Sequence, residues 1–117
     1  MDLEKIREYC LSKLAATEGF PFDRQTLVFK VGGKMFALID IENPFSVNVK
    51  CEPEKAIELR EHHQAILPGY HMSKKHWNTI QLNQDLSHQL IMNCLDHSYQ
   101  LVFQSLSKKT RGEIEIR

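Results

Sequence analysis

The sequence predicts a single α+β domain of two layers, in which a five-stranded antiparallel sheet carries its helices on one face. The chain has 117 residues, 42% hydrophobic and 26% charged, which suits one globular domain with one core. Stretches with strand-like alternation are followed twice by stretches with helical periodicity. No repeat, linker or low-complexity segment divides the chain. The predicted order over residues 1–117 is therefore helix, three strands, helix, two strands, helix.

A helix is predicted at the N-terminus, because Asp2 is a favourable N-cap and Gly19 favours a helix end. The apolar residues of this stretch recur at helical spacing, namely Leu3, Ile6, Cys10 and Leu14. After Gly19 the chain crosses to the sheet. There, Phe20 and Phe22 are interpreted as plugs that close one end of the core, in preference to the alternative that they stack on a ligand.

A β-hairpin is predicted next, with strands at Thr26–Val31 and Lys34–Ile41. Gly32-Gly33 joins them, because a two-residue hairpin turn requires positive backbone angles. This turn sets Phe29 opposite Phe36 and Leu27 opposite Leu38, all four toward the core. The other face then carries Val28, Lys30, Met35, Ala37 and Ile39.

A third strand, a helix and a long C-terminal helix are also predicted. Ser46–Cys51 alternates, with Val47, Val49 and Cys51 inward, and Pro53 begins a helix that continues to about His63. Asp85 is the predicted cap of an amphipathic run that reaches Leu106, with a bend allowed at residues 96–98. The tail after Lys108 is assigned no fixed structure.

The stretch Leu67–Leu82 predicts a second hairpin. Pro68-Gly69 opens it as a turn, residues 70–72 and 77–82 form its strands, and residues 73–75 reverse the chain. Without a bulge, Trp77 lies on the open sheet face beside Asn48 and Lys50. A β-bulge at residues 73–76 would instead turn Trp77 into the core, and both possibilities stay open.

The same stretch carries a family resemblance. His76-Trp77-Asn78 follows Lys74-Lys75 and is preceded by Pro68-Gly69-Tyr70-His71-Met72. Further pieces agree in order, namely residues 20–23, 28–31, 33–38, Lys50, residues 53–56, Ser98-Tyr99 and Leu101-Val102. Together these resemble the MmcQ/YjbR family of small bacterial proteins. The resemblance implies a two-layer α+β domain similar to the secretion-chaperone fold, and DNA binding by two hairpins that form a "double wing".

Two functions of different class are compatible with the sequence. In the first, the hairpins contact double-stranded DNA through Lys30, Lys34, Lys50, Lys74, Lys75, His76 and Trp77. The formal net charge is zero, so such binding must come from a local basic patch, and lysines at hairpin tips also protect sheet edges. In the second, a non-enzymatic interaction or chaperone-like module docks a partner, or a second copy, on the open sheet face at Val28, Met35, Ala37 and Ile39.

Catalytic, metal and cofactor sites are not expected. Gly32-Gly33-Lys34 lacks the other residues of a phosphate-binding loop, and His71 and His76 flank a turn without a third zinc ligand. The three cysteines, Cys10, Cys51 and Cys94, are far apart and lie among apolar residues, which favours reduced, buried thiols. No signal peptide or membrane-spanning run is recognisable, so a cytoplasmic protein without membrane contact is expected.

Overall fold

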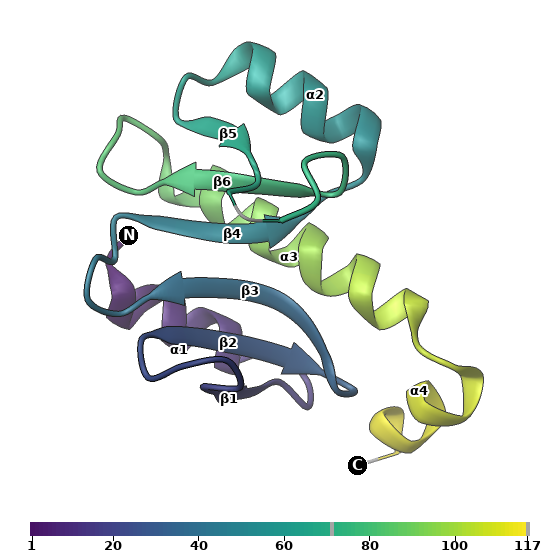
Figure 1. The fold of residues 1–117 in the computed structure, drawn as a ribbon. Coiled ribbons are helices and arrows are strands. Elements are labelled where there is room, and N and C mark those ends of the chain that lie inside the picture. The colour runs from purple at the N-terminus through teal and green to yellow at the C-terminus, as the bar shows by residue number, and fades with distance from the viewer. Residues whose placement is uncertain (71, 117) are drawn as a thin grey trace.

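The computed structural model describes residues 1–70 and 72–116 and consists of a helical layer packed on one sheet (Figure 1). The helices are α1 (Leu3–Leu11), α2 (Pro53–His62), α3 (His88–Ser105) and α4 (Lys108–Glu115). The strands are β1 (Thr17–Gly19), β2 (Thr26–Val31), β3 (Lys34–Asp40), β4 (Ser46–Lys50), β5 (Ile66–Pro68) and β6 (Trp77–Gln81).

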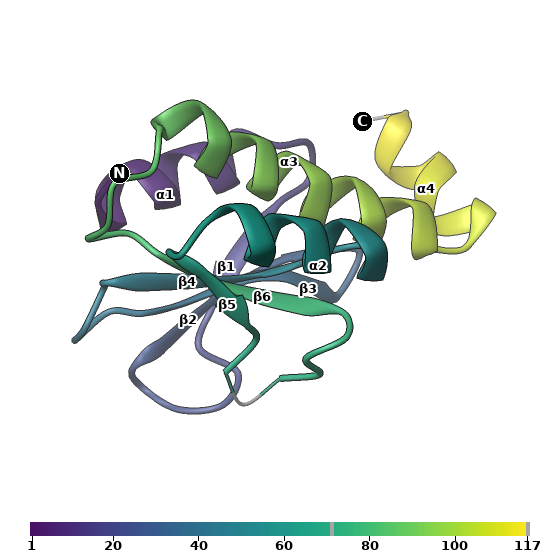
Figure 2. The same ribbon diagram turned by 90° about the horizontal axis from the view of Figure 1, so that it is seen from above.

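The sheet is antiparallel, and its strand order is β1-β2-β3-β4-β6-β5. All four helices lie on one side of it, whereas the β1–β2 and β5–β6 connections project from the other side (Figure 2). The predicted class is therefore confirmed, but the sheet has six strands rather than five. The additional strand, β1, has only three residues and no apolar alternation, so its sequence carries no strand signal.

The main core lies between the helices and the sheet. Its buried residues include Ile6 and Cys10 of α1, Phe29 and Phe36 of the first hairpin, and Leu95 of α3. The Asp2 carboxylate accepts a hydrogen bond from the Lys5 backbone N–H at 2.9 Å, which confirms the predicted N-cap.

The N-terminal helix ends earlier than predicted, at Leu11. Ala15 has a φ of 57°, and this left-handed residue turns the chain into β1 well before Gly19. Leu14 is consequently exposed rather than part of the apolar stripe. The prediction that Phe20 and Phe22 plug the core is also wrong, because 47% and 63% of their surfaces are exposed.

The first hairpin has the predicted turn but a different register. Gly32 and Gly33 have φ angles of 58° and 81°, as their turn requires. The β2–β3 pairing then shifts between Phe29 and Lys30, so that Phe29 lies opposite Ala37.

This β-bulge inverts the predicted faces of β3 beyond Phe36. Phe36 and Ala37 both belong to the main core, followed by Ile39, while Leu38 lies on the open face with Val28. The predicted core position of Leu38 and the predicted open positions of Ala37 and Ile39 are therefore wrong.

Ser98 of α3 occupies the place where β3 and β4 separate beyond the Ala37–Val49 pair. Its buried hydroxyl donates to the Phe36 carbonyl at 2.5 Å and accepts from the Lys50 N–H at 2.8 Å. The Ser98 side chain thus takes the place of a missing backbone hydrogen bond between β3 and β4.

The second half of the chain departs from prediction in three places. β5 covers residues 66–68, where the opening turn of the second hairpin was predicted, and the connection that follows it is correspondingly longer. α3 is capped by Ser87 rather than Asp85, and it continues through residues 96–98 as one helix. Residues 108–115 form α4, which is capped by Ser107 and buries Ile114 in the main core. The β4 alternation and α2 agree with prediction.

Among the described residues, no helix combines the length and apolar character that a membrane crossing requires. All three cysteines are free and buried, as their apolar surroundings predicted.

Candidate functional site

A small apolar cluster lies on the sheet face opposite the helices. It consists of buried Val28, Leu38 and Trp77, with Met35 and Met72 packed against them, and is called the open-face cluster below. Trp77 is paired with Lys50 without a register shift, so of the two possibilities that the sequence left open, the place on the open face is the one found. Only 8% of Trp77 is exposed, however, so its ring is not available for stacking on a base.

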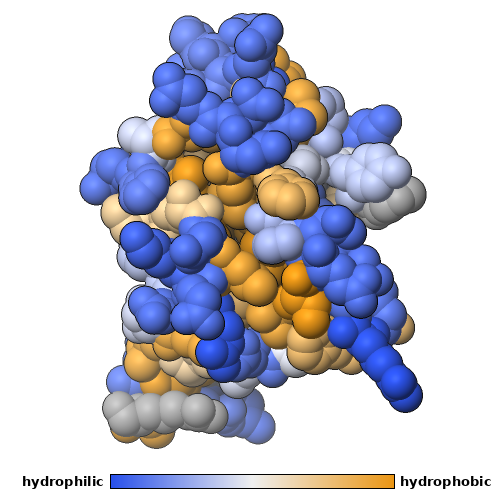
Figure 3. Space-filling view, turned by 90° about the vertical axis from the view of Figure 1, so that its left-hand side faces the viewer, coloured by the Kyte–Doolittle hydropathy of each residue, from blue (hydrophilic) through white to orange (hydrophobic). Residues whose placement is uncertain are grey.

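A groove of about 760 Å³ lies beside this cluster. Three aromatic side chains along it, Phe22, Phe45 and Tyr70, are 63%, 58% and 68% exposed. Its remaining lining includes Met35, Leu38, Asn48, Met72 and Thr79, with Asp23 and Asp40 toward one end. On the side of the molecule that carries the β3–β4 connection, apolar atoms form a band between polar margins (Figure 3).

The β5–β6 connection is held against the sheet by a chain of hydrogen bonds. The Tyr70 N–H donates to the Thr79 hydroxyl at 2.9 Å, and this hydroxyl donates to the Asn48 side-chain oxygen at 2.5 Å. The Gly69 N–H donates to the Trp77 carbonyl at 2.8 Å. A Cβ at Gly69 would lie 2.7 Å from the Trp77 Cβ, so only glycine allows this close approach.

Arg60 of α2 holds the same connection from the helical side. Its guanidinium donates to the Asn78 side-chain oxygen at 2.7 Å and to the Lys74 carbonyl. Asn78 faces the helices, opposite Val49. The connection that carries Lys74 and Lys75 is therefore anchored in both layers.

The groove has an acidic end. The Asp40 carboxylate accepts from the Gln25 amide at 2.7 Å and from the Glu42 and Asn43 N–H groups at 2.9 and 3.2 Å. Burial alone would raise the pKa of Asp40, but these hydrogen bonds outweigh it and lower the pKa. Backbone hydrogen bonds from Thr26 and Gln25 likewise lower the pKa of Asp23. Both carboxylates are therefore ionised at neutral pH.

The opposite end of the same face is basic. Lys30 pairs with Met35 and Lys50 pairs with Trp77, so both lysines lie where β2 and β4 end. Lys74, Lys75 and His76 are exposed in the connection that leads into β6. In the described part of the chain, the ion pairs are Arg7–Glu18 and Lys13–Asp96, so these lysines have no acidic partner there.

The two predicted wing tips lie at the same end of the strands but lean into different layers. The Lys34 ammonium donates to the Ser105 carbonyl of α3 at 3.4 Å, and the side chain of Leu106 packs against Gly32. The β2–β3 turn therefore rests against the helical layer, whereas the β5–β6 connection lies on the open side (Figures 1 and 2).

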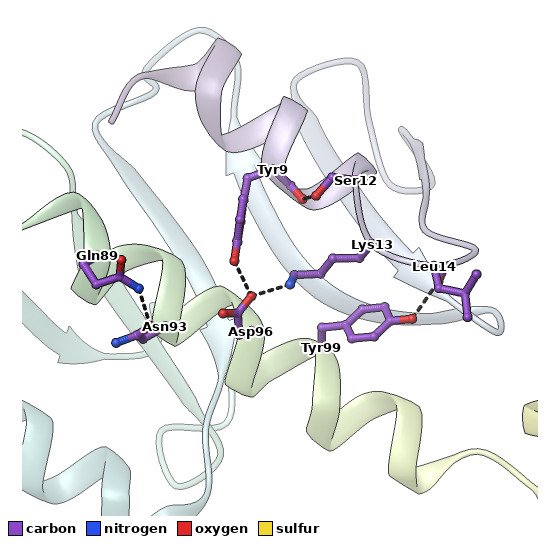
Figure 4. Close-up of polar contacts among 8 residues, drawn as sticks. All are labelled: Tyr9, Ser12, Lys13, Leu14, Gln89, Asn93, Asp96 and Tyr99. Carbon is purple, nitrogen blue, oxygen red and sulfur yellow. Dashed lines mark hydrogen bonds and ion pairs between the residues drawn. The ribbon is translucent and has the colours of Figure 1, made fainter. Parts of the chain in front are cut away.

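A polar network joins α1 to α3 on the helical side (Figure 4). The Asp96 carboxylate accepts from the Tyr9 hydroxyl at 2.6 Å and from the Lys13 ammonium. The hydrogen bond to Asp96, with partial burial and the charge of Asp96, raises the pKa of Tyr9 to about 12. Nearby, the Tyr99 hydroxyl donates to the Leu14 carbonyl at 2.6 Å. The network fastens α1 and the chain after it to the core.

A smaller cavity, of about 100 Å³, lies between α2, α3 and β4 and is lined by Cys51, Cys94 and His97 among others. Burial raises the pKa of both thiols, that of Cys94 to about 11, so they are protonated at neutral pH. The His97 Nε2 accepts from the Glu52 N–H at 3.1 Å. Among the described residues, no cluster of three or more His, Cys, Asp or Glu side chains could hold a metal. His71, which with His76 was expected to flank the turn of the second hairpin, lies outside the described residues.

Sequence reasoning gave Phe45 and Tyr70 no binding role and favoured a core position for Phe22. Phe22 and Phe45 had a visible signal, since each adjoins a proline in a turn-forming stretch where a large apolar side chain has no strand or helix to bury it. Tyr70 was assigned to a strand. Asp23 and Asp40 lie close to this groove only because β2 pairs with β3.

Comparison with known proteins gives consistent matches. A family model described as YjbR matches residues 11–101. The chain is 31% identical over 112 residues to the uncharacterized protein YjbR of Escherichia coli strain K12, with 95% of each chain covered. It is 32% identical over 96 residues to the uncharacterized protein YbdF of Escherichia coli O157:H7, covering 81% of this chain and 79% of that protein. The crystal structure of Deinococcus radiodurans protein DR2400, domain DUF419, superposes with a TM-score of 0.91 at 40% identity, covering 97% and 88% of the two chains.

Proposed function

Since the chain belongs to the YjbR family, we propose that it is a non-enzymatic binding protein that docks an apolar segment of a polypeptide in the groove on its open sheet face. The observation that carries the proposal is the gathering of three largely exposed aromatic side chains, Phe22, Phe45 and Tyr70, around one groove. Isolated exposed apolar residues are ordinary, but a contiguous patch bordered by polar residues is typical of an interaction site.

The chemistry of the groove suits a polypeptide. Aromatic side chains provide large contact areas at low entropic cost, and the thioethers of Met35 and Met72 adapt to irregular apolar surfaces. Asn48 and Thr79 add polar groups between them. The names of the relatives assign no activity. We place the protein in the cytoplasm, because three free buried thiols are compatible with a reducing compartment.

Site-specific photo-crosslinking tests this function. A photo-activatable benzoyl-phenylalanine replaces Phe45 in the full chain in its native host, and the same residue replaces Ile57 of α2 in a control. Ile57 is a matched position, since it is 53% exposed and Phe45 is 58% exposed. We expect a defined polypeptide adduct at position 45 only, identified by mass spectrometry and reproduced with the purified partner. Equal adduct patterns at the two positions would contradict the proposal.

A second candidate function, DNA binding, is favoured by one observation. Lys30, Lys50, Lys74 and Lys75 gather at one end of the open face without acidic partners among the described residues. Phosphate contacts need reach and positive charge, so these lysines with His76 provide a local patch on a neutral protein. In this function the buried Trp77 packs beneath the patch and does not contact DNA. The Lys34 ammonium donates to the Ser105 carbonyl of α3 and is not part of the patch.

Fluorescence anisotropy with duplex DNA across a salt series tests this second function. Affinity should fall steeply with salt, and replacing Lys74 and Lys75 by alanine should reduce the slope by about two units. The control replaces Lys108 and Lys109 of α4, which removes the same charge from another element. No binding at low salt, or equal effects of the two double substitutions, would rule out this patch.

A further inference from the structure

We propose that the occupant of the open-face groove is a second copy of this chain, packed face to face about a two-fold axis that lies between the two sheets and runs across the strands. The inference rests on the proposed function and names its partner. Three features carry it: the polarity of the groove, the symmetry of a homodimer and the size of the face.

The open face is polarised along its strands. Asp23 and Asp40 lie at the end where β2 begins and β3 ends, because Thr26 pairs with Asp40 and its N–H donates to Asp23 at 2.6 Å. Lys30 and Lys50 lie at the other end, with Lys74 and Lys75 nearby in the β5–β6 connection. β3 spans seven residues, so roughly 20 Å separates the two ends.

Symmetry converts this polarity into complementarity. In an isologous dimer the same patch meets itself, so each feature must find its complement on that same patch. An axis across the strands reverses the strand direction of the second copy but leaves each strand opposite its own counterpart. The carboxylates of each copy, at β2 and β3, then face Lys30 on β2 of the other copy, with Lys50 close by on β4. An axis along the strands would place like charges together. The charges therefore select one of the two face-to-face arrangements.

The size and net charge of the molecule are compatible with this dimer. A standard interface buries roughly 800 Å² per partner, which is about a ninth of the 7054 Å² accessible surface of this chain. The six strands contain 29 residues, which at a rise of about 3.3 Å and a strand spacing of about 4.8 Å give a footprint of about 460 Å², to which the flanking loops add. The formal net charge of zero means that two copies do not repel each other at long range.

Analytical ultracentrifugation of the purified full chain over a wide concentration range tests the proposal. We expect a reversible dimer whose affinity falls as salt is raised. Replacing Phe22 and Phe45 by serine should weaken it at least about tenfold, as expected for central apolar contacts. Ile57→Ser is the control, because it removes an equally exposed apolar side chain from α2 and should leave the dimer unchanged.

Charge reversal tests the orientation of the two copies. Lys30→Glu with Lys50→Glu should weaken the dimer at low salt, because these lysines lie at the end of β2 and β4 that faces the carboxylates of the other copy. Lys108→Glu with Lys109→Glu makes the same charge change on α4 and should not. Adding Asp40→Asn to the first pair should partly restore the dimer, since it removes a repulsion between copies. Asparagine keeps one side-chain oxygen, which can still accept from the Glu42 and Asn43 N–H groups as Oδ1 of Asp40 does, and loses only the oxygen that accepts from Gln25.

A chain that stays monomeric at every concentration, or a dimer weakened by Ile57→Ser and not by the phenylalanine substitutions, would overturn the inference. The proposed function fails separately. If the chain is monomeric but crosslinks to another polypeptide at position 45, only the proposal of a second copy is refuted. If no specific adduct forms at this position, both the dimer and the proposed function are refuted.

Discussion

Ser98 has an unusual role for a helix residue, because it completes the hydrogen bonds of a sheet. The β3 bulge leaves the Phe36 carbonyl and the Lys50 N–H without strand partners for each other, and the Ser98 hydroxyl bonds to both. Ser98 and Phe36 are fully buried and the bond from Lys50 is partly buried, so an unpaired polar group is costly here.

Ser98→Ala should therefore lower the free energy of unfolding by about 1 to 3 kcal/mol, because it leaves the buried Phe36 carbonyl and the partly buried Lys50 N–H unpaired. Urea denaturation measures the change. Ser105→Ala is the control, since the Ser105 hydroxyl bonds only within α3, to the Val102 carbonyl at 2.6 Å, and its loss should cost less than about 0.5 kcal/mol. Equal effects of the two substitutions would contradict the bridging role.

Asp96 gives a pH-dependent prediction. Burial would raise the pKa of Asp96, but the hydrogen bonds from Lys13 and Tyr9 and the Lys13 charge together lower it below its ordinary 3.8. A lowered pKa in the folded state stabilises the protein above the unfolded pKa, and the stabilisation is lost as the pH falls through the folded pKa.

Asp96→Asn should accordingly destabilise the protein at pH 7 by only about 1 kcal/mol, because 43% of the Asp96 side chain is exposed. The difference between the two proteins should shrink as the pH is lowered below 3.8. Urea denaturation across pH measures it, with Asp85→Asn in the exposed β6–α3 connection as the control. A difference that stays constant into acid would show that the charge of Asp96 contributes nothing.

At the scale of elements, the β5–β6 connection decides whether the open-face cluster is covered. Met72 of this connection packs on the open-face cluster, Gly69 lies against the backbone of Trp77, and the Arg60 guanidinium donates to the Lys74 carbonyl. The close approach at Gly69 means that added volume must move the connection.

Gly69→Ala should displace the connection and shift the fluorescence emission of Trp77, the only tryptophan, to longer wavelength as water reaches it. Gly19→Ala is the control, because a Cβ there meets nothing within 4 Å. Emission spectra of both folded variants make the comparison. An unchanged spectrum for Gly69→Ala would mean that the connection does not determine the environment of Trp77.

On the scale of the whole molecule, one sheet separates two apolar clusters. The main core contains α1, α3 and α4 residues, whereas the open-face cluster has only sheet and loop residues. Unfolding of the strands under one cluster would also disrupt the other cluster, because β2, β3 and β6 contribute residues to both.

Unfolding should therefore be a single cooperative transition. Trp77 fluorescence reports the open-face cluster and far-ultraviolet circular dichroism reports the helices, so their urea midpoints should coincide. A fluorescence transition at lower urea would show that the open face unfolds independently. The Gly69→Ala variant is a useful comparison, since it perturbs only the cover of Trp77.

The sequence by itself determined the features that depend on neighbouring residues. The α+β class, the Gly32-Gly33 turn, the β4 alternation and the start of α2 at Pro53 are all confirmed, because each follows from backbone preference or local periodicity. The sequence left the face of Trp77 undecided, because only the unbroken β4–β6 pairing excludes the bulge that would turn it inward.

Only the tertiary structure decided the features that depend on distant partners. The bulge at Phe36 is stabilised by Ser98 from α3, and it alone settles which of Leu38 and Ile39 is in the core. The short strand β1 exists through its pairing with β2, and α4 is anchored by burying Ile114. The groove also belongs to this group, since Phe22, Phe45 and Tyr70 come from three separate connections that meet only when the sheet forms.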